Sequence, residues 1–540
     1  MQKQLSILLL VLCLSSILKA QEGYFVTFTD KNNTPYSIDK PSEFLSQRAI
    51  ERRTKQAISI TEQDLPVNPE YIDSLKKADI DVRHSSKWFN AVIVFSGNTT
   101  LMDTLDRVSF IHSVEKTKPA ASAPSQINKF EESFPKLKSS NTDIYGDAWD
   151  QIRTINGHLL HQQGYTGKGM HIAVIDAGFN SVDNLPLFQH LWDNDQILGT
   201  KDFVNPLSNI FAEDTHGMNV LSIIGGEMPN EYTGTAPDAN FWLLRTEDAY
   251  SETPIEPDYW ICAAEFADSA GVDIINTSLG YYEFDVPTLS YTRLDMDGST
   301  RISQASEIAA AKGMVLVTSA GNEGNNYWHY IAAPADARNI LSVGAIAADS
   351  TKASFSSYGP TFDGRIKPEV SAMGVSTAVQ NTSGGISRGN GTSFSAPVIA
   401  GMVACLWQAY PGKTASEIRE IVISSANQSN IPDNELGYGI PNFELAYKTD
   451  ITSTNETDEN WAVSPNPFTK HLTISNHLYP ANGVISISMY DIIGNLILRK
   501  TYAYQNQIIL DEVSAFANGI YILIIENNHF KQHVKVIKSY

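Results

Sequence analysis

Short apolar runs alternate with helical stretches through the middle of the chain. Four runs bounded by Gly, Asp or Asn are predicted to be strands: His171–Ile175, Val272–Asn276, Met314–Thr318 and Ile340–Val343. Helices are predicted between them, for example at Asp258–Ala270 and Ala305–Lys312. Because strands buried on both faces are apolar throughout, the pattern predicts a parallel sheet with helices on both faces, an α/β domain over residues 147–448.

The segment before this domain mixes smaller elements. The predicted elements are the strands Tyr24–Phe28, Ala91–Phe95 and Phe110–Val114 and the helices Pro41–Arg53 and Leu101–Arg107. They indicate a small α+β domain over residues 21–118. Residues 119–146, which are rich in Pro, Ala, Ser and Asn up to residue 142, are predicted to be an exposed linker.

After a second, polar linker at residues 449–460, the pattern changes to strands separated by turn signals. Six strands are predicted, at His471–Ser475, Val484–Asp491, Leu496–Arg499, Ile508–Asp511, Ile520–Glu526 and Val534–Lys538. The pair Gly494 and Asn495 is a hairpin signal. Residues 461–540 are therefore predicted to form a small all-β sandwich.

Residues 1–20 have the pattern of a secretory signal peptide. Lys3 precedes the apolar run Leu5–Leu14, and Ala20 suits the last position before cleavage. The run is too short to span a membrane as a helix. Cys13 raises the alternative of a lipoprotein, which is disfavoured because Leu12 stands where a small residue is needed.

Composition and charge exclude some classes of protein but do not select a function. A chain of 540 residues predicts about three or four folding units, and its 42% hydrophobic content argues against wholesale disorder. The 39 Lys and Arg residues against 60 Asp and Glu give a formal net charge of −21. Because nucleic-acid binding needs a basic surface, we expect no nucleic-acid partner.

Two cysteines remain after the signal peptide, Cys262 and Cys405. Both lie in apolar, helix-like stretches, which favours two buried free thiols. A disulfide between them stays open, because the sequence does not fix their distance.

Three polar residues stand at the ends of predicted elements in the α/β domain. Asp176 follows a strand, His216 opens a helix-like run, and Ser393 lies beside another helix start. Singly, each suits an ordinary structural role as a turn residue, a packed histidine or a helix cap. Together they are the residue types of a catalytic triad, in which a carboxylate orients a His that takes the proton of a Ser hydroxyl.

The order and the flanks of these residues resemble the subtilase family. Asp before His before Ser is the subtilisin order, and Gly169–Asp176, His216–Gly217 and Gly391–Pro397 resemble subtilase signatures. The resemblance implies a subtilisin-like fold and a secreted serine endopeptidase that acts on proteins or peptides through an acyl-enzyme. It implies no required cofactor.

Further site residues follow from the same resemblance. In the family, the Asn of a motif like Ser319–Gly324 donates its amide to the oxyanion that develops in acyl transfer, which implies that role for Asn322. The backbone N–H of Ser393 would be the second donor. Two segments are implied to line the substrate peptide: Ser278, Leu279 and Gly280 on one side, and Ala320 and Gly321 on the other.

Two positions depart from the family pattern, and one segment raises a metal site. Ala177 and Met218 stand where the family usually has Ser or Thr, so each removes a hydroxyl and leaves every reacting group in place. Asp295–Gly298 is compatible with a calcium-binding turn, but it is short, and an ordinary surface turn is favoured. No metal site is predicted, and structural calcium is left unsupported.

The flanking domains also carry resemblances. The first, most clearly over Ser86–Val92, resembles subtilase prodomains, which implies an intramolecular inhibitor whose last strand lies in the substrate cleft. We hypothesise that the linker after it, the maturation site, is then cut. The last domain resembles type IX secretion sorting domains through Ser464–Phe468, Tyr490–Asn495, Asn518–Ile522 and Lys535–Lys538.

That second resemblance implies export through the periplasm by outer-membrane secretion machinery, ending in a secreted or cell-surface protein. An accessory β-sandwich that binds carbohydrate or stabilises the enzyme is the alternative for the tail. For the α/β domain, the alternative is a non-catalytic surface or adhesion protein on a subtilase scaffold. An acid-acting, sedolisin-like relative with a Glu base is disfavoured by His216.

Overall fold

The computed structural model describes residues 21–120, 127–130, 144–453, 462–475, 484–491, 494–503, 507–526 and 531–539. The predicted signal peptide, including Cys13, and most of both linkers lie outside the described residues. The chain divides into two compact units, residues 1–447 and 448–540, and each is described by itself.

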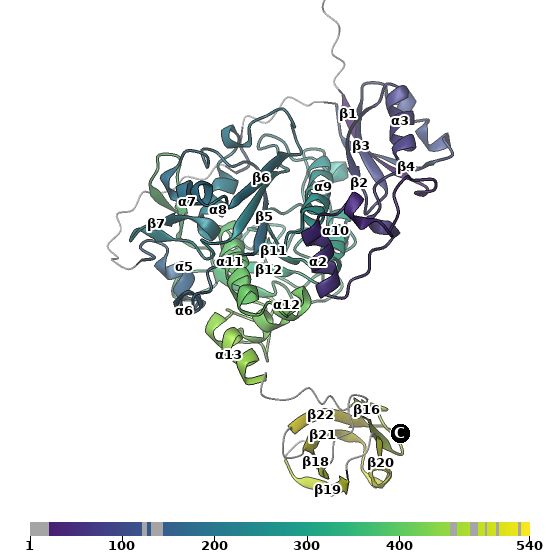
Figure 1. The fold of residues 1–540 in the computed structure, drawn as a ribbon, viewed down its shortest axis with the longest axis vertical. Helices are drawn as coiled ribbons and strands as arrows, with labels where there is room; N and C mark the ends of the chain where they lie inside the picture. The colour runs from purple at the N-terminus through teal and green to yellow at the C-terminus, as the bar shows by residue number, and fades with distance from the viewer. Residues whose placement is uncertain are drawn as a thin grey trace, which may run out of the picture. The chain divides into compact units, whose positions relative to one another are not determined.

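A seven-stranded parallel sheet forms the centre of the first unit (Figure 1). Its strands follow the order β13 (Val370–Met373), β12 (Leu341–Ile346), β11 (Val315–Ser319), β10 (Ile274–Thr277), β5 (His171–Asp176), β9 (Asn240–Arg245) and β6 (Ile197–Asp202). The four predicted strands are confirmed as β5, β10, β11 and β12. The edge strand β6 was missed because most of its residues are only half-buried or exposed, so it lacks a continuous apolar run.

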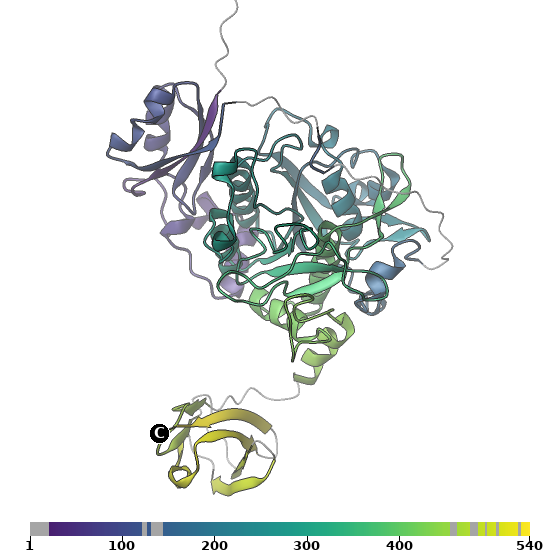
Figure 2. The same ribbon diagram turned by 180° about the vertical axis from the view of Figure 1, so that it is seen from behind.

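Helices cover both faces of this sheet, which confirms the α/β prediction. On one face, α8 (His216–Gly225) and α11 (Thr392–Ala409) pack into one hydrophobic core. On the other, α9 (Ile255–Ala270) and α10 (Arg301–Ala311) pack into a second core (Figure 2). Among the described residues, α11 alone is long and apolar enough to cross a membrane, and 89% of it is buried inside the fold.

The two cysteines lie in these two separate cores and are free thiols, as favoured above. Cys405 is in the core beneath α11, and Cys262 is in the core beneath α9. The sheet therefore stands between them.

Shorter elements complete the α/β domain. They are α5 (Trp149–Arg153), α6 (His158–Gln162), α7 (Gln189–Asp193), α12 (Ala415–Ser424), α13 (Phe443–Ser453), and the strand pairs β7 (Glu227–Met228) with β8 (Tyr232–Thr233) and β14 (Thr377–Gln380) with β15 (Ile386–Gly389).

The prodomain has the predicted α+β character. Its four-stranded antiparallel sheet has the order β2 (Asp81–Ser86), β3 (Ala91–Ser96), β1 (Glu22–Phe28) and β4 (Ile111–Lys118), with helices α2 (Gln47–Lys55), α3 (Pro69–Lys77) and α4 (Thr99–Met102). The single helix expected from Pro41 to Arg53 is wrong in its first half. Pro41–Glu43 is a 3-10 turn, and α2 begins after Ser46, whose hydroxyl accepts a hydrogen bond from the Ala49 N–H at 3.1 Å.

This prodomain sheet packs on α9. The side chains of Phe25, Trp88 and Phe95 share a core with Tyr259 and Trp260 of that helix. Helix α2 also contacts α9, away from the prodomain sheet (Figure 1). The N-terminal domain thus covers the outer side of a helix whose inner side packs on the seven-stranded sheet.

Charged groups are buried in the same interface. The Asp268 carboxylate on α9 lies 2.5 Å from Arg52, 2.7 Å from Arg53 and 3.0 Å from Lys87. These three prodomain cations lower the pKa of Asp268 although its burial acts in the opposite direction. Nearby, Glu265 accepts hydrogen bonds from the backbone N–H groups of Lys87 at 2.7 Å and Trp88 at 3.1 Å.

The second unit is the predicted all-β sandwich. One antiparallel sheet has the order β16 (Ala462–Ser464), β17 (Leu472–Ser475) and β20 (Gln507–Leu510), and the other has the order β19 (Leu496–Ala503), β18 (Val484–Asp491), β21 (Gly519–Glu526) and β22 (Lys531–Lys538). Apolar side chains from both sheets, such as Leu472 and Leu523, share one core. The β18–β19 hairpin forms at Gly494, whose φ of +89° suits a glycine.

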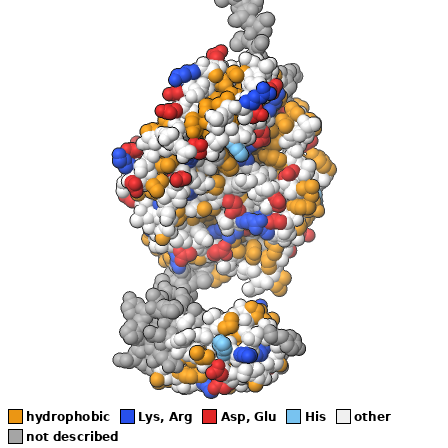
Figure 3. All heavy atoms as spheres, turned by 90° about the vertical axis from the view of Figure 1, so that its right-hand side faces the viewer, with side chains coloured by type: hydrophobic (Ala, Val, Ile, Leu, Met, Phe, Trp, Pro, Cys, Tyr) orange, Lys and Arg blue, Asp and Glu red, His pale blue; other side chains and the backbone are white. Residues whose placement is uncertain are grey.

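Acidic and basic side chains are mixed on the face drawn in Figure 3. They are interspersed there with polar and apolar surface, without a broad basic expanse. That face therefore lacks the continuous positive surface that phosphate binding needs.

Candidate active site

The predicted site residues gather at the carboxyl ends of three neighbouring strands. Asp176 is the last residue of β5, Ser278 follows β10, and Ala320 follows β11. These strands are adjacent in the sheet. Carboxyl ends of parallel strands are where α/β sheets form their sites, so one motif from each strand meets at one edge.

Asp176 and His216 form a buried pair. The Asp176 Oδ1 atom lies 2.7 Å from the His216 Nδ1 atom, and the aspartate is fully buried. Burial raises the pKa of Asp176, while the adjacent imidazole acts to lower it. The pair can hold one tautomer of the imidazole, with its other nitrogen directed away from the carboxylate.

Local sequence explains how His216 reaches this position. The Asp214 carboxylate accepts a hydrogen bond from the His216 N–H at 2.8 Å, which fixes the start of α8. Residue 217 has to be a glycine, because a Cβ atom there would come within 2.4 Å of the Gly178 carbonyl oxygen. The helix therefore approaches the turn after β5 closely enough to form the pair.

Ser393 lies in the first turn of α11 and touches β10. Its hydroxyl donates to the Ser278 carbonyl at 3.2 Å, and the Ser278 hydroxyl donates to the Ser393 carbonyl at 2.8 Å. Ser393 is 8% exposed and lines the cleft, while the residues that follow it in α11 are buried.

Asn322 is oriented by Thr392, a residue that the sequence analysis did not assign. The Asn322 Oδ1 atom accepts hydrogen bonds from the Thr392 N–H and hydroxyl, both at 2.9 Å. Because the amide oxygen is held by two donors, the Nδ2 group is the remaining donor of this side chain. The arrangement suits stabilisation of negative charge in the cleft.

A cavity of about 190 Å³ joins these groups. Seven of the predicted residues line it: His216, Ser278, Leu279, Gly280, Gly321, Asn322 and Ser393. Ala320 is fully buried and packs against Ile331 and Ala335. Asp176 is likewise buried, behind His216.

The linker also lines the cleft, which the sequence analysis did not foresee. Lys129 and Phe130 belong to the lining, and the Phe130 ring centroid lies 4.8 Å from that of His216. The last prodomain strand, β4, pairs with β1 and its Glu115 contacts Arg301. The expectation that this strand lies in the cleft is corrected: the described segment in the cleft is 127–130, since β4 is held at the prodomain sheet.

The two departures from the family pattern have defined surroundings. The Ala177 N–H donates to the Asp176 Oδ1 atom at 2.7 Å, whereas the Oδ2 atom has no hydrogen-bond partner among the described residues. Met218 is fully buried in the core beneath α8. Ala177 thus holds the carboxylate through its backbone, and Met218 adds packing.

The segment Asp295–Gly298 forms a turn. The Asp295 carboxylate accepts hydrogen bonds from the Thr292 N–H and hydroxyl at 2.7 and 2.8 Å, and Asp297 accepts one from the Ser299 N–H at 2.9 Å. Both carboxylates therefore serve the local backbone.

Three family models match the chain. The subtilase family matches residues 167–439, and the peptidase S8 propeptide domain of Bacteroidota matches residues 23–132. The secretion system C-terminal sorting domain matches residues 462–539. The propeptide match includes the 127–130 segment that lies in the cleft.

Several known proteins are similar over the central domain. Subtilisin DY of Bacillus licheniformis is 28% identical over 298 residues, which cover 55% of this chain and 97% of that protein. Subtilisin of Bacillus pumilus is 31% identical, covering 51% of this chain and 90% of its own. Subtilisin NAT of Bacillus subtilis subsp. natto is 32% identical, and this chain spans 65% of its length.

Proposed function

This chain belongs to the subtilase family and is a secreted serine protease, and we propose that Asp176, His216 and Ser393 form its catalytic triad. The observation that carries the proposal is the 2.7 Å contact between the buried Asp176 carboxylate and the His216 imidazole, at a cleft that Ser393 also lines. The substrates proposed are proteins and peptides cut at internal bonds.

In the proposed reaction, the Ser393 Oγ atom attacks the carbonyl carbon of the scissile bond while His216 takes its proton. His216 then gives that proton to the leaving amine as the carbon–nitrogen bond breaks, which leaves an acyl-enzyme. A water molecule, deprotonated by His216, releases the acid product. Asp176 keeps the imidazole in the correct tautomer and stabilises its protonated form.

Asn322 is proposed to stabilise the negative oxygen of the tetrahedral intermediate together with the Ser393 N–H. Its amide is held in place beforehand by Thr392, so little reorganisation is needed when charge develops. A donor of this kind lowers the barrier by about 3–4 kcal/mol. All of these groups are side chains or backbone of the chain, so we propose that no cofactor takes part in the reaction.

The substrate is proposed to bind as an added strand between two walls. Ser278, Leu279 and Gly280 form one wall, and Ala320 and Gly321 form the other. Backbone pairing of this kind gives affinity across many sequences, because it uses groups that every peptide has.

The flanking parts are proposed to control where and when the protease acts. The prodomain, residues 21–118, would inhibit the enzyme until the linker at 119–146 is cut, and residues 461–540 would carry it through the outer-membrane secretion machinery. The propeptide and sorting-domain matches support this. N-terminal sequencing of the secreted enzyme tests it, since an active enzyme that still begins at Gln21 would contradict it.

The decisive experiment compares the wild-type chain with Ser393→Ala in casein hydrolysis and in labelling by a serine-reactive fluorophosphonate. Ser395→Ala is the matched control, because Ser395 is also buried on α11 and its hydroxyl has no hydrogen-bond partner among the described residues. Wild type and Ser395→Ala should cleave and label, and Ser393→Ala should do neither. A Ser393→Ala variant that labels and cleaves would overturn the assignment.

A further inference from the structure

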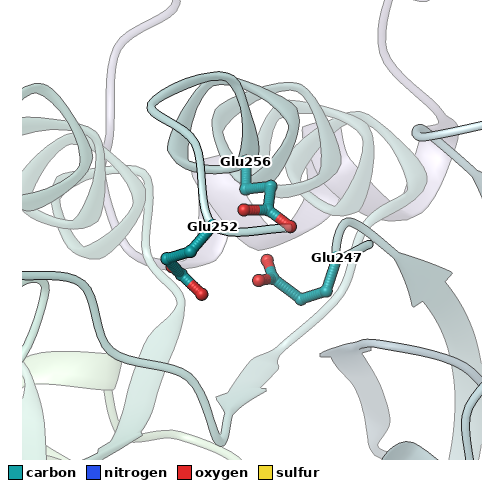
Figure 4. Close-up of side chains that lie close together, drawn as sticks. All are labelled: Glu247, Glu252 and Glu256. Carbon is teal, nitrogen blue, oxygen red and sulfur yellow. The ribbon is translucent and has the colours of Figure 1, made fainter. Parts of the chain in front are cut away.

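Three glutamates converge beside the catalytic cleft (Figure 4). Glu247 follows β9, Glu252 lies in the next loop, and Glu256 is in the first turn of α9. One carboxylate oxygen from each lies within 4.8 Å of the others, and the Glu247 and Glu256 side chains are each only 1% exposed. Burial and mutual repulsion raise the pKa of Glu252 and Glu256, so a cation placed among the three carboxylates is favoured because it keeps them ionised.

In this structure the cation is Lys129. Its ammonium group lies 2.7 Å from Glu252, 2.9 Å from Glu256 and 3.0 Å from Glu247. Burial acts to lower the pKa of Lys129, but the three carboxylates outweigh it and raise that pKa well above its ordinary value. The lysine therefore stays charged and satisfies all three acids at once.

The segment that carries Lys129 lies as a substrate peptide would lie. The Lys129 N–H donates to the Ala249 carbonyl at 3.0 Å, a backbone contact of the kind that an added strand makes. The next residue, Phe130, packs on His216, and both linker residues line the same cavity as Ser393. The lysine side chain thus enters the acidic cluster from the substrate side.

The pocket is also fixed in place without the lysine. Glu256 accepts hydrogen bonds from the Asp248 N–H at 2.8 Å and the Thr253 N–H at 2.9 Å, and the Tyr281 hydroxyl donates to Glu247. These donors belong to the catalytic domain. When the linker is cut and leaves, the Glu247 and Glu256 carboxylates therefore keep these donors and lose only their cation, and Glu252 stays tied through its backbone N–H, which donates to Asp285 at 3.1 Å.

We propose that Glu247, Glu252 and Glu256 form a specificity pocket for a lysine or arginine side chain of the substrate. Lys129 occupies this pocket in the uncut chain as an internal substitute for that side chain. The proposal rests on the protease function above and adds a substrate class to it. The enzyme should therefore cut best near basic residues, although backbone pairing by itself would accept many sequences.

The first test measures kcat/KM of the processed enzyme on pairs of fluorogenic peptides that differ only by lysine or norleucine at each position before the cut. At one position, lysine should be favoured by about tenfold or more, and Glu256→Gln should reduce this to about threefold or less. Norleucine peptides should be cut at nearly unchanged rates. Glu252→Gln, in a loop, repeats the test if Glu256→Gln folds poorly, and Glu420→Gln, an exposed acid on α12, is the control.

Separate outcomes bear on the two proposals. An enzyme that is labelled by fluorophosphonate but cuts lysine and norleucine peptides equally at every position would overturn the pocket and leave the protease intact. An enzyme that cuts nothing and is not labelled would overturn the protease assignment itself.

The second test asks whether a metal ion replaces Lys129 after processing. Calcium chloride and EDTA are added to the processed wild type and to Glu256→Gln, and thermal unfolding is followed. The proposal predicts equal effects on both proteins. Calcium stabilisation that Glu256→Gln abolishes would identify the cluster as a metal site and overturn the proposal.

The third test uses the uncut chain. Lys129→Gln removes the internal cation and loosens the linker, so in a Ser393→Ala background, where the chain cannot cut itself, added chymotrypsin should cut the linker several-fold faster than when Lys129 is present. Lys76→Gln, an exposed lysine on α3, is the control in the same background and should leave the rate of cutting unchanged. Unchanged cutting of Lys129→Gln would count against the lysine as the occupant that holds the linker in the cleft.

Discussion

The two faces of the catalytic sheet are covered by helices of different character. Helices α8 and α11 carry no acidic residue, and they are buried along almost their whole length. Helix α9 buries four carboxyl groups, on Glu256, Asp258, Glu265 and Asp268. One face is thus an ordinary apolar core, and the other contains buried charge.

The partners of those charges explain the difference. Asp258 pairs with Arg301 of the neighbouring helix α10, within the catalytic domain. Glu256 pairs with Lys129, and Asp268 pairs with Arg52, Arg53 and Lys87. Glu265 accepts hydrogen bonds from the turn between β2 and β3. All of these partners lie in the propeptide. Helices α8 and α11, which carry the proposed catalytic residues His216 and Ser393, have no acid that needs a partner, whereas three of the four buried carboxyl groups of α9 have their partners in the propeptide.

The largest expected effect is on the apolar face. His216→Ala should lower kcat by about 10^6-fold, because the nucleophile loses its base. The folded state should be retained, since α8 keeps its apolar contacts. Burst kinetics with an activated ester measure the loss, and circular dichroism checks the fold. Retention of more than a thousandth of the rate would show that another group acts as the base.

The next effect concerns stability and is expected only on the face of the sheet that α9 covers. Asp268→Asn leaves prodomain cations without a charge partner, so it should destabilise the uncut chain by about 3–5 kcal/mol. In the processed domain, where those cations have left, the cost should be below about 1 kcal/mol. Urea unfolding in a Ser393→Ala background, with and without cleavage by added wild-type enzyme, gives both values. An equal loss of unfolding free energy in the uncut and the processed protein would show that the propeptide cations are not the partners on which Asp268 depends.

A comparable effect is expected at Asn322, the proposed oxyanion donor. Asn322→Ala should reduce kcat by about 10²–10³-fold and leave KM nearly unchanged, since the lost hydrogen bond forms in the transition state. Steady-state kinetics on one peptide are sufficient. If KM rises while kcat holds, Asn322 binds the ground state and the assigned role fails.

The smallest effect is a pH dependence on the α9 face. With Lys129 in the pocket, where it stands for a substrate lysine, burial raises the pKa of Glu252 to about 7 while the lysine acts to lower it, and Glu247 and Asp285 also raise it. Its charge is therefore present above that pH and is lost as pH falls. The ratio of lysine to norleucine cleavage should fall several-fold between pH 8 and pH 6, and Glu252→Gln should flatten this change. A ratio independent of pH in wild type would contradict it.

The apolar face could be predicted from sequence because its signals are local. Asp176, His216 and Ser393 each stand beside a recognisable strand end or helix start, and buried strands such as β5 are apolar throughout. Their contacts are long-range, but family motifs identify the residues without geometry. Thr392 was missed because its role depends on the Asn322 amide, which comes from the loop after β11, seventy residues earlier in the chain.

The charged face could not be predicted in the same way. Lys129 lies in a polar linker, and its partners are more than one hundred residues away along the chain. Glu256 and Asp268 are ordinary helix residues until something covers them. A charge in sequence indicates a solvated surface by default, so only the folded arrangement identifies these as buried pairs.

The buried start of α11 also determines how the enzyme loses activity. Ser393 is the second residue of an 18-residue helix whose first sixteen residues are buried in the largest core of the domain. Amides of that kind exchange with solvent only when the whole domain opens, since no smaller opening releases them. Inactivation by heat should therefore follow global unfolding rather than local fraying. Glu252 lies in a loop that is held by two hydrogen bonds between its backbone and Asp285 and not by a buried helix, so selectivity between substrates should fade at temperatures where turnover itself persists.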